Sequence, residues 1–424
     1  MANVLEVVMV PNGWIEGRVG DLLEGLESGV SVNGEDRDFV GDENAVLKVS
    51  AVTYGTFDPT AAKVIDGLEL DRAKTNPKRG QIIISRSNTE ELVGASAYID
   101  RDYPHLFLPD KLWQTIPKQN SDMKWLSYIL ASSHVRYALS NLATGTSGSM
   151  KNITKGELLS LKVLIPSPLE QKKIAQVLST WDKAISTTEQ LLANSQQQKK
   201  ALMQQLLTGK KRLLDKNGVR FSGEWVHGRL GELCTFKGGS AFKEKYQGHS
   251  EGDLPFIKVS DMNLRGNEKY IGYANNWLTN QAAKEIKAKA FPKDAIVFAK
   301  VGAALLLNRR RILLRPTIID NNMMAAIPTS SGDTEFIYQL MLAVDFAKFV
   351  QDGAVPSVNQ GDLASFKITY PEKEEQQKIA AVLSTADQGI TVLQQKLAAL
   401  KQEKKALMQQ LLTGKRRVKV EAAA

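Results

Sequence analysis

The sequence KKALMQQLLTGK occupies residues 199–210 and occurs again, unchanged, at residues 404–415. The two copies lie 205 residues apart (404 − 199), which is nearly half of the 424-residue chain. Solenoid repeats have periods of about 20–50 residues, so this longer period indicates that a whole domain has been duplicated together with a helix. Two similar but unequal halves in one polypeptide indicate a pseudo-symmetric reader of a two-part target.

The duplication extends upstream of this stretch. LSTWD at residues 178–182 returns as LSTAD at 383–387, and the openings WIEGRVGDL at 14–22 and WVHGRLGEL at 225–233 correspond. Between these anchors, short runs rich in Val, Ile and Phe and bounded by Gly, Asn, Asp and Pro predict strands, and one helix is predicted in each half at 122–141 and 334–351. The loops differ between the halves, which is typical of two domains that bind different versions of one kind of ligand.

A long amphipathic helix is predicted after each domain. Its apolar residues recur in alternating steps of four and three, the a/d register of a coiled coil. Proline before each helix and Thr-Gly after it predict where the helices start and stop. The apolar a/d stripe, which we call the seam, is weaker in the first helix because its centre is polar. The predicted seam residues are Ile174, Leu178, Trp181, Ile185, Leu192, Leu202 and Leu206 in the first helix and Ile379, Leu383, Ile390, Leu393, Leu397, Leu400, Leu407 and Leu411 in the second.

The two helices are expected to pair with each other. Roughly 40 helical residues at about 1.5 Å each give a rod of about 60 Å. Two such rods packed antiparallel would relate the two domains by about a 180° rotation, so that on a DNA duplex the domains would read opposite strands. The alternative is two independent amphipathic helices, each packed on its own domain.

The predicted fold is α/β (α+β), with two similar globular domains that alternate with two long helices pairing as an antiparallel coiled coil. The predicted segments are a first recognition domain at 1–165, a first helix at 166–211, a second recognition domain at 212–371, a second helix at 372–417 and a tail at 418–424.

Composition restricts the class of protein. The formal charge of +9 and the pI of about 9.3 fit a protein that binds a polyanion. The single cysteine, Cys234, excludes an intramolecular disulfide and favours a reducing compartment. No 18-residue apolar run and no signal-peptide pattern are present, so we expect a cytoplasmic protein without a membrane span.

Catalytic and metal-binding patterns are missing from the sequence. The four histidines (His105, His134, His227 and His249) have no partner at metal-ligand spacing. No G-x-S-x-G elbow, no Walker A sequence, no methyltransferase signature and no glycine-rich cofactor loop occur. The sequence therefore predicts neither catalytic residues nor a metal site, and it indicates recognition rather than chemistry.

Cations occur where loops that contact phosphates or base edges are expected. Polar residues that can contact base edges accompany them. The predicted DNA-binding residues are Lys74, Lys78, Arg79, Arg86, Asn88 and Arg101 in the first domain and Lys237, Ser240, Lys243, Lys300, Arg309, Arg310 and Arg311 in the second. For each cation, a solvated surface position is the alternative.

The layout resembles the specificity (S) subunit of type I restriction–modification systems over essentially the whole chain. The resemblance is carried by the Trp14 and Trp225 openings, by ISRSN at 84–88 with ELVG at 91–94, and by GDL at 361–363. Its strongest features are LEQKKI at 169–174 and EEQQKI at 374–379, each continuing to LLTG. The second domain departs from the first at residues 300–302, where KVG stands in place of RSN.

The resemblance implies a non-catalytic DNA-binding subunit. It implies a bipartite asymmetric site, one half per recognition domain, with a gap set by the helices. It also implies two modification subunits that methylate adenine N6 with S-adenosylmethionine, and restriction subunits that translocate and cleave DNA with ATP and Mg; none of these cofactors would bind this chain. The alternative function is a coiled-coil scaffold for other proteins, without sequence-specific DNA binding.

Overall fold

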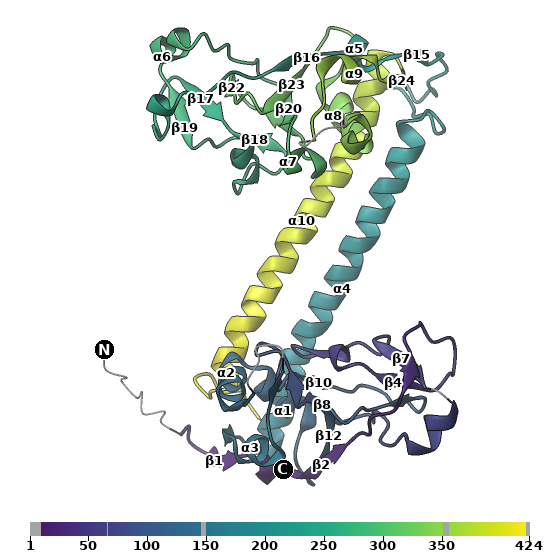
Figure 1. Cartoon of the computed structure of the whole chain (residues 1–424), viewed down its shortest axis with the longest axis vertical. Helices are drawn as coiled ribbons and strands as arrows, with labels where there is room; N and C mark the ends of the chain where they lie inside the picture. Colours follow the sequence, from purple (N-terminus) through teal and green to yellow (C-terminus); the bar gives the residue numbers. More distant parts are fainter. Residues whose placement is uncertain (1–9, 66, 146–149, 351–355, 421–424) are drawn as a thin grey trace. The chain divides into compact units, whose positions relative to one another are not determined.

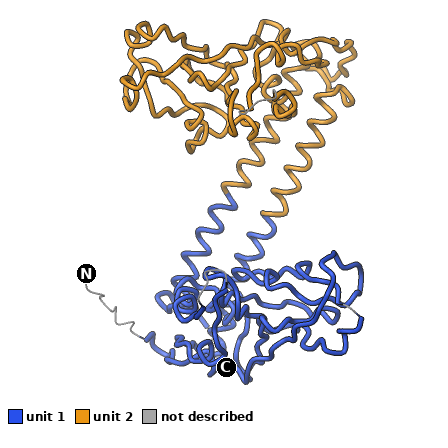
Figure 2. The backbone as a smooth tube through the Cα atoms, in the orientation of Figure 1, with its two compact units in different colours: residues 1–188, 396–424 blue, residues 189–395 orange. Residues whose placement is uncertain are grey.

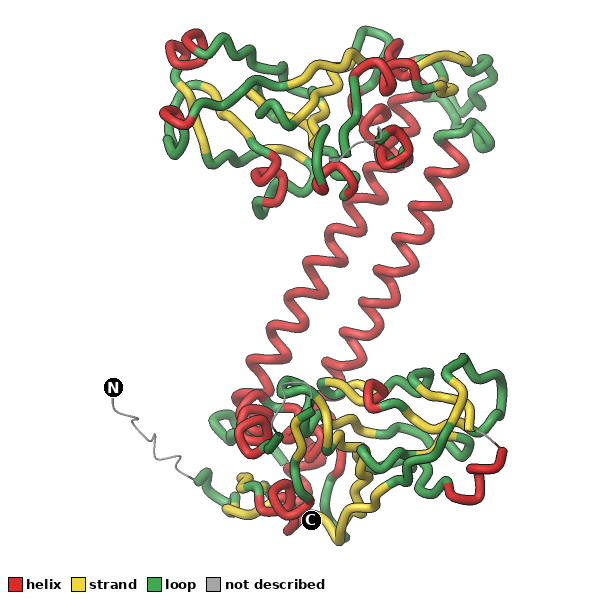
Figure 3. The backbone as a smooth tube through the Cα atoms, viewed as in Figure 1, coloured by secondary structure: helices red, strands yellow, loops and turns green. Residues whose placement is uncertain are grey.

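The structure is a computed structural model that describes residues 10–65, 67–145, 150–350 and 356–420. The chain divides into two compact units (Figure 2): unit 1 comprises residues 1–188 and 396–424, and unit 2 comprises residues 189–395. The boundary falls inside both long helices, α4 (Pro168–Leu206) and α10 (Lys373–Leu411). Each unit therefore contains one globular domain of mixed helix and strand and part of each long helix (Figure 3).

The centre of unit 1 is an antiparallel sheet of four strands in the order β10-β8-β12-β2 (Figure 1). These strands are β2 (Leu23–Ser28), β8 (Ile82–Ser85), β10 (Ser96–Tyr98) and β12 (Leu112–Pro117). In β8, Ile82 and Ile84 join the core that contains α1 (Met123–Ala131), whereas Ile83 joins a second core on the other face. The uninterrupted apolar run therefore forms a strand that is buried on both faces.

Smaller elements complete unit 1. A second sheet has the order β11-β4-β7-β3, and three further pairs of strands join β1 with β14, β9 with β13 and β5 with β6. The first strand of the domain thus lies beside its last strand. The bounds are β1 (Ile15–Arg18), β3 (Gly34–Glu35), β4 (Ala45–Leu47), β5 (Val52–Thr53), β6 (Thr56–Phe57), β7 (Ala62–Ile65), β9 (Ser87–Asn88), β11 (Leu106–Phe107), β13 (Lys151–Asn152), β14 (Lys162–Ile165), α2 (Ser133–Leu142) and α3 (Lys155–Ser160).

Unit 2 repeats this plan with a five-stranded sheet in the order β16-β23-β20-β21-β18, a three-stranded sheet in the order β19-β17-β22, and a β15–β24 pair that again joins the first and last strands. The central strand β20 alternates in the same way as β8, with Ile296 and Phe298 in one core and Val297 in another. The bounds are β15 (Val226–Arg229), β16 (Cys234–Gly238), β17 (Leu254–Ile257), β18 (Tyr270–Ile271), β19 (Asn276–Leu278), β20 (Ile296–Ala299), β21 (Arg311–Leu313), β22 (Ile318–Ile319), β23 (Met323–Pro328), β24 (Lys367–Tyr370), α5 (Leu230–Leu233), α6 (Asn280–Glu285), α7 (Ala303–Leu306), α8 (Thr334–Ala343) and α9 (Gln360–Ser365).

The helix predicted at 122–141 is two helices, α1 and α2, so the prediction of a single helix was wrong. The break is at Ser132, whose backbone is extended (φ −66°, ψ 147°) and whose hydroxyl donates to the carbonyl of Ile129 at 2.7 Å. Serine competes with the helical backbone for hydrogen bonds in this way. In unit 2, α8 ends at Ala343 and a 3-10 turn follows at Phe346–Phe349, while residue 351 lies outside the described residues.

The predicted starts and stops of the long helices are confirmed. α4 begins at Pro168 and α10 begins two residues after Pro371. Both are followed by glycines with left-handed backbones, Gly209 (φ +70°) and Gly414 (φ +69°). A β-carbon at Gly414 would lie 2.3 Å from a ring carbon of Pro11, and at Gly209 it would lie 3.1 Å from the Trp225 ring. Glycine is therefore required there both by conformation and by close packing.

All predicted seam residues of α4 and α10 are buried or half-buried. In unit 1, Ile174 and Leu178 of α4 share a core with Leu411 of α10. In unit 2, Leu206 of α4 shares a core with Ile379 and Leu383 of α10. The apolar stripe is thus shielded in each unit, and a coiled coil that is continuous over both helices stays a prediction.

Candidate nucleic-acid interface

Arg86 directly follows β8, at the end of the unit 1 sheet where β12 begins and β2 ends. Its side chain is about one-third exposed, and Asp110 holds its guanidinium on one side. Nε donates to the Asp110 backbone carbonyl at 2.9 Å, and Nη2 donates to the Asp110 carboxylate at 3.2 Å. The same carboxylate group accepts from the Ser31 hydroxyl at 2.8 Å. Partial burial acts to raise the pKa of Asp110, but hydrogen bonds from Ser31 and Arg86 outweigh it and the pKa lies below its ordinary value.

Several polar residues surround this place, which we call the Arg86 end of the unit 1 sheet. Asn88 lies in β9 beside Lys151 of β13, and its amide donates to the Ser85 hydroxyl at 3.3 Å. The loop that carries the exposed Lys74 reaches the same end, because the Thr75 hydroxyl donates to the carbonyl of Ser28 at 3.3 Å. Three of the six residues predicted in this domain, Lys74, Arg86 and Asn88, are therefore brought together.

The other three predicted residues of this domain lie at the opposite end of β8. Gly80, just before β8, donates its N–H to Ile99 at 2.9 Å, which places it beside the end of β10. Arg79 and Lys78 are exposed there, and the exposed Arg101 lies over the Tyr103 ring at 4.9 Å. The structure thus divides the predicted set into two groups, one at each end of the sheet.

Lys300 occupies the corresponding place in unit 2. It follows β20 where β16 ends and β23 begins, and its N–H donates to the carbonyl of Asn322 at 2.9 Å. Within the described ranges, its half-buried ammonium has no hydrogen-bond or ion-pair partner. Lys237 of β16 is exposed and Ser240 follows that strand half-buried, so these two predicted residues lie at the same end as Lys300. Lys243 is exposed further along this loop.

The arginine triplet of unit 2 divides into three environments. Arg309 is exposed and donates to the side chain of Asn263. Arg311 is half-buried, and its guanidinium donates to the backbone carbonyls of Arg310 and Met262. Burial lowers the pKa of Arg311.

Arg310 is only 1% exposed, and its guanidinium stacks on the Phe346 ring at 3.7 Å from the centroid. It donates to Asn308 at 3.1 Å and to the carbonyl of Val344 at 3.2 Å. Burial lowers its pKa to about 10, so it remains charged at neutral pH. The prediction that Arg310 contacts DNA does not fit this structure, because its side chain is enclosed by the core and has almost no surface for a ligand.

The repeated motifs at the helix starts anchor each domain to its long helices. In unit 1, Gln171 accepts the N–H of Asp122 at 3.0 Å, and Asp122 caps α1. Glu170 is 2% exposed and accepts the Trp14 indole N–H at 2.9 Å. Its two carboxylate oxygens accept from Nε and Nη2 along one edge of the Arg417 guanidinium at 2.7 and 2.8 Å. The strongest sequence motif of the resemblance is therefore structural: it fixes the domain to the helices.

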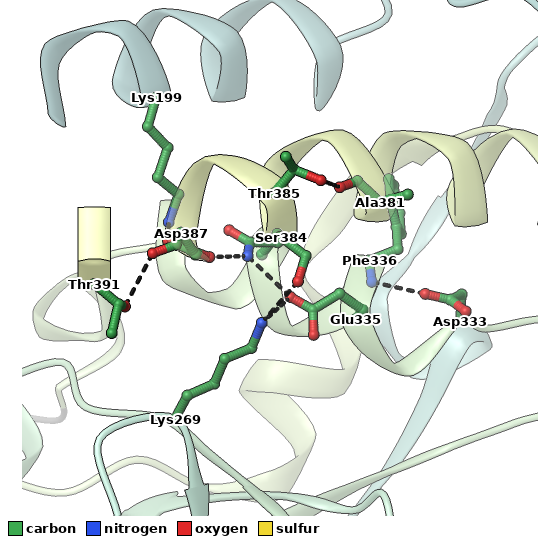
Figure 4. Close-up of polar contacts among 11 residues, drawn as sticks. Lys199, Lys269, Asp333, Glu335, Phe336, Ala381, Ser384, Thr385, Asp387 and Thr391 are labelled. Atoms are coloured by element: carbon green, nitrogen blue, oxygen red, sulfur yellow. Dashed lines mark hydrogen bonds and ion pairs between the residues drawn. The ribbon is translucent and has the colours of Figure 1, made fainter. Parts of the chain in front are cut away.

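Unit 2 contains the same anchor. Gln376 accepts the N–H of Asp333 at 3.0 Å. The fully buried carboxylate of Glu375 accepts two hydrogen bonds from the Arg212 guanidinium at 2.6 and 2.7 Å. Further along the helices, Lys199 of α4 pairs with Asp387 of α10 at 2.6 Å (Figure 4). Since Lys199 comes before Arg212 and Asp387 comes after Glu375, the two helix parts of this unit run antiparallel.

In unit 1 the corresponding ion pair joins Lys404 to Asp182 at 2.5 Å. Together with the Arg417–Glu170 pair, it shows that the two helix parts of this unit also run antiparallel. Asp182 also accepts from Tyr128 of α1 at 2.5 Å, as Asp387 accepts from Gln339 of α8 at 2.6 Å. Lys199 and Lys404, which interrupt the apolar stripe of the helices, are thus paired with aspartates of the other helix. Partly buried polar pairs in a helical seam specify its register.

A groove of about 1360 Å³ in unit 1 lies between α2, the β1–β14 pair and the last turns of α10. Its apolar lining includes the buried Ile129 and Leu412. A groove of about 520 Å³ lies on the corresponding β15–β24 pair of unit 2. Arg18 faces Lys162 across the first pair and Arg229 faces Lys367 across the second, an arrangement of like charges that costs free energy. The same like-charged pair occurs in both units. Five exposed cations line the larger groove: Arg18, Lys162, Lys401, Lys405 and Lys415.

Among the described residues, no group of three or more His, Cys, Asp or Glu side chains could hold a metal ion. In the same part of the chain, no helix is both long enough and apolar enough to cross a membrane.

Two similar mixed domains on repeated helices, with Arg86 directly after β8 in one and Lys300 directly after β20 in the other, are typical of a tandem recognition protein. The sequence pattern of the type I restriction modification DNA specificity domain matches residues 11–194 and again 222–402. The chain therefore belongs to the family of type I specificity subunits, whose members are the non-catalytic subunits of restriction–modification systems.

Individual relatives agree with this assignment. The type I restriction enzyme MjaVIII specificity subunit of Methanocaldococcus jannaschii is 25% identical over 429 residues, covering 97% of this chain and 94% of the relative. The EcoR124I/EcoR124II specificity subunit of Escherichia coli is 24% identical over 238 residues, covering 53% and 55%. The crystal structure of an S subunit from M. genitalium has the same fold, with a TM-score of 0.61 at 16% identity and coverage of 94% of this chain and 96% of that one.

The sequence reasoning missed Asp110 and Ser31, which position Arg86. Asp110 lies 24 residues after Arg86 in the chain, and only the pairing of β8 with β12 brings them together. The Pro109-Asp110 pair, which is typical of a turn, was the one available signal in the sequence. The residues Lys111 and Lys151 were also missed, since nothing in their local sequence places them near Arg86.

Proposed function

We propose that this chain is the sequence-specific DNA-binding subunit of a cytoplasmic type I restriction–modification complex and reads a bipartite, asymmetric site. The observation that carries the proposal is the repeated position of a cation, Arg86 in unit 1 and Lys300 in unit 2, at the same end of two similar sheets. The loops around the two cations differ, so the two domains would read different half-sites. The other exposed cations would contact phosphates and give affinity that depends on salt.

Apart from Arg310 and Arg311, whose guanidinium groups donate to backbone carbonyls, the exposed and half-buried residues of the predicted set remain the candidates for DNA contact. Arg86, Asn88, Lys300 and Ser240 stand beside strand ends and are proposed to read bases. Lys74, Lys78, Arg79, Arg101, Lys237, Lys243 and Arg309 are proposed to contact the backbone. The proposed recognition domains are residues 1–165 and 212–371, and the proposed spacers are 166–211 and 372–417.

The long helices are proposed to set the distance between the two recognition domains and so the gap between the half-sites. Antiparallel pairing over their full length would hold the two recognition domains at a fixed distance and relate them by a half-turn, as in symmetric dimers on palindromic sites. The antiparallel ion pairs within each unit, Lys404 with Asp182 and Lys199 with Asp387, support this arrangement.

The proposed partners are two modification subunits that methylate adenine N6 and restriction subunits that cleave DNA. S-adenosylmethionine, ATP and Mg would be bound by those subunits. One structure with the same fold (TM-score 0.54, 17% identity) comes from a study of complex assembly in the type I system. The grooves with cationic rims on the β1–β14 and β15–β24 pairs support docking of a modification subunit with an acidic surface.

The test of the function is a map of methylated adenines in cells that express this chain with its modification partner. We expect two short, unlike sequence blocks separated by a fixed number of unspecified bases. Two results would instead favour the alternative of a protein-interaction scaffold. One is methylation without a common sequence, and the other is a complex that does not prefer a duplex carrying the mapped site over scrambled DNA.

A change in length at the end of the first long helix tests whether the helices set the gap between the half-sites. Insertion of a few residues between Thr208 and Arg212 moves the second domain relative to the helices, so the complex should methylate sites with an altered gap and unchanged half-sites. Methylation mapping measures the gap directly. A matched insertion in the exposed loop around Gly41, away from the helices, should leave the gap as it is, and a gap that stays constant in both variants would show that the helices are not the spacer.

A further inference from the structure

Arg86 differs from the other predicted DNA contacts in how its guanidinium is held. A guanidinium carries five N–H donors, and Asp110 takes two of them, Nε–H and one Nη2–H, along one edge. Among the described residues, no acceptor receives Nη1, so the outer edge with Nη1 and the second Nη2 hydrogen is free. The half-buried side chain therefore presents a fork of two parallel donors in a fixed orientation.

Three hydrogen bonds further limit the motion of this fork. Asp110 is itself fixed by the Ser31 hydroxyl, and the Arg86 backbone is fixed on both sides, donating to the carbonyl of Lys111 at 3.0 Å and accepting from Ile153 at 3.0 Å. A side chain held in its binding orientation loses little rotamer entropy when it binds. The arrangement suits a ligand with two adjacent acceptors better than it suits a diffuse negative charge.

In the major groove, guanine offers two such acceptors, O6 and N7, and the bidentate arginine–guanine pair is the commonest specific contact in protein–DNA complexes. We infer that Arg86, positioned by Asp110 and Ser31, reads one guanine in the half-site bound by the unit 1 domain. This inference rests on the proposed function and adds to it the base, the reading residue and two positioning residues.

Unit 2 provides an internal contrast. Lys300 stands at the corresponding sheet end, but no carboxylate in the described chain orients its ammonium. A lysine ammonium is a rotating point charge rather than a fork. We therefore expect Lys300 to contribute less discrimination between bases than Arg86 does.

The test uses the full chain in complex with its modification partner and a duplex that carries the mapped site. Each guanine of the site is replaced in turn by 7-deazaguanine, which lacks only the N7 acceptor. Wild-type affinity should fall about 10-fold or more at one guanine, the loss of a bidentate base contact being on the order of 1–3 kcal/mol. Arg86→Lys should bind the natural site more weakly and should not respond to the replacement at that guanine.

The positioning residues are tested by Asp110→Asn and Ser31→Ala, which keep Arg86 and should reduce the 7-deazaguanine effect at the same guanine while binding to unrelated DNA stays unchanged. The matched controls are Asp58→Asn and Arg37→Lys. Asp58 is an exposed aspartate that accepts from Thr60 and has no arginine partner among the described residues, and Arg37 is paired with Glu43 on the surface. Both controls should behave as wild type, and melting temperatures check that each variant is folded.

Three outcomes would overturn the inference. The first is an Arg86→Lys complex that still loses affinity at every guanine where wild type does. The second is equal weakening on specific and unrelated DNA with a smaller salt slope, which identifies a phosphate contact. The third is a site without any N7-sensitive guanine. Failure of the proposed function is distinguishable, because the wild-type complex would then show no preference for the mapped duplex at all.

Discussion

Replacement of Arg212 by alanine should destabilise unit 2 by about 3–5 kcal/mol, the cost of leaving a buried carboxylate without its partner. Glu375 is fully buried, and Arg212 binds both of its oxygens at 2.6 and 2.7 Å. Arg212 also donates to the carbonyl of Gly223 at 2.9 Å, so the variant loses a second anchor for the chain that leads into the domain.

Hydrogen exchange measured by mass spectrometry can locate this effect, which matters because a chain with two units need not unfold in one step. In Arg212→Ala, protection should fall at the start of α10 and in the β15–β24 pair. In Arg417→Ala, which uncovers Glu170, the same loss should appear at the start of α4 and in the β1–β14 pair. The surface control Arg37→Ala should leave the protection of both strand pairs unchanged, since its partners are exposed.

The double variant Arg212→Met/Glu375→Leu should recover most of the lost stability, because an apolar pair of similar volume is often as stable as a buried ion pair. A loss below about 1 kcal/mol in Arg212→Ala, or a loss of protection spread evenly over both units, would contradict this account of the anchor.

Replacement of Arg310 by alanine should lower stability by about 2–4 kcal/mol and leave the sequence preference of the folded protein unchanged. The variant removes the stack on Phe346 and the hydrogen bonds to the Val344 carbonyl and to Asn308, whose side-chain oxygen keeps only the Phe346 N–H as a donor. Thermal unfolding of the variant measures the first effect, and binding to specific and scrambled duplexes measures the second.

Two neighbouring changes serve as controls for Arg310. Arg310→Met keeps much of the packing and should cost less than the alanine variant. Arg309→Ala removes an exposed arginine and should change stability by no more than about 0.5 kcal/mol. The core role would be refuted if Arg310→Ala melted like wild type and bound its specific duplex more weakly.

The two results for the arginines show where sequence reasoning reached its limit. Arg86 and Arg310 both stand beside an apolar strand and look equally able to contact DNA in the sequence. Arg86 meets a carboxylate at the sheet surface, whereas Arg310 lies over an aromatic ring in the core. Local sequence does not distinguish these cases, because the deciding partners, Asp110 and Phe346, lie 24 and 36 residues away.

The prediction of a single helix at 122–141 was wrong for a related reason. Its apolar periodicity is continuous, and the break depends on one serine that bonds back to the carbonyl of Ile129. Such a competition between side chain and backbone has a small free energy, so packing on either side of Ser132 decides it.

The sequence by itself determined the duplication, the long helices with their starts and stops, the buried central strands and the family, because these depend on periodicity and on residues that act within a few positions of one another. Only the tertiary structure decided which charges are anchors, which lie in the core and which stay exposed. The free energy of a charged side chain depends on its burial and on partners that folding brings from distant parts of the chain, as Glu170 meets Arg417 and Arg86 meets Asp110.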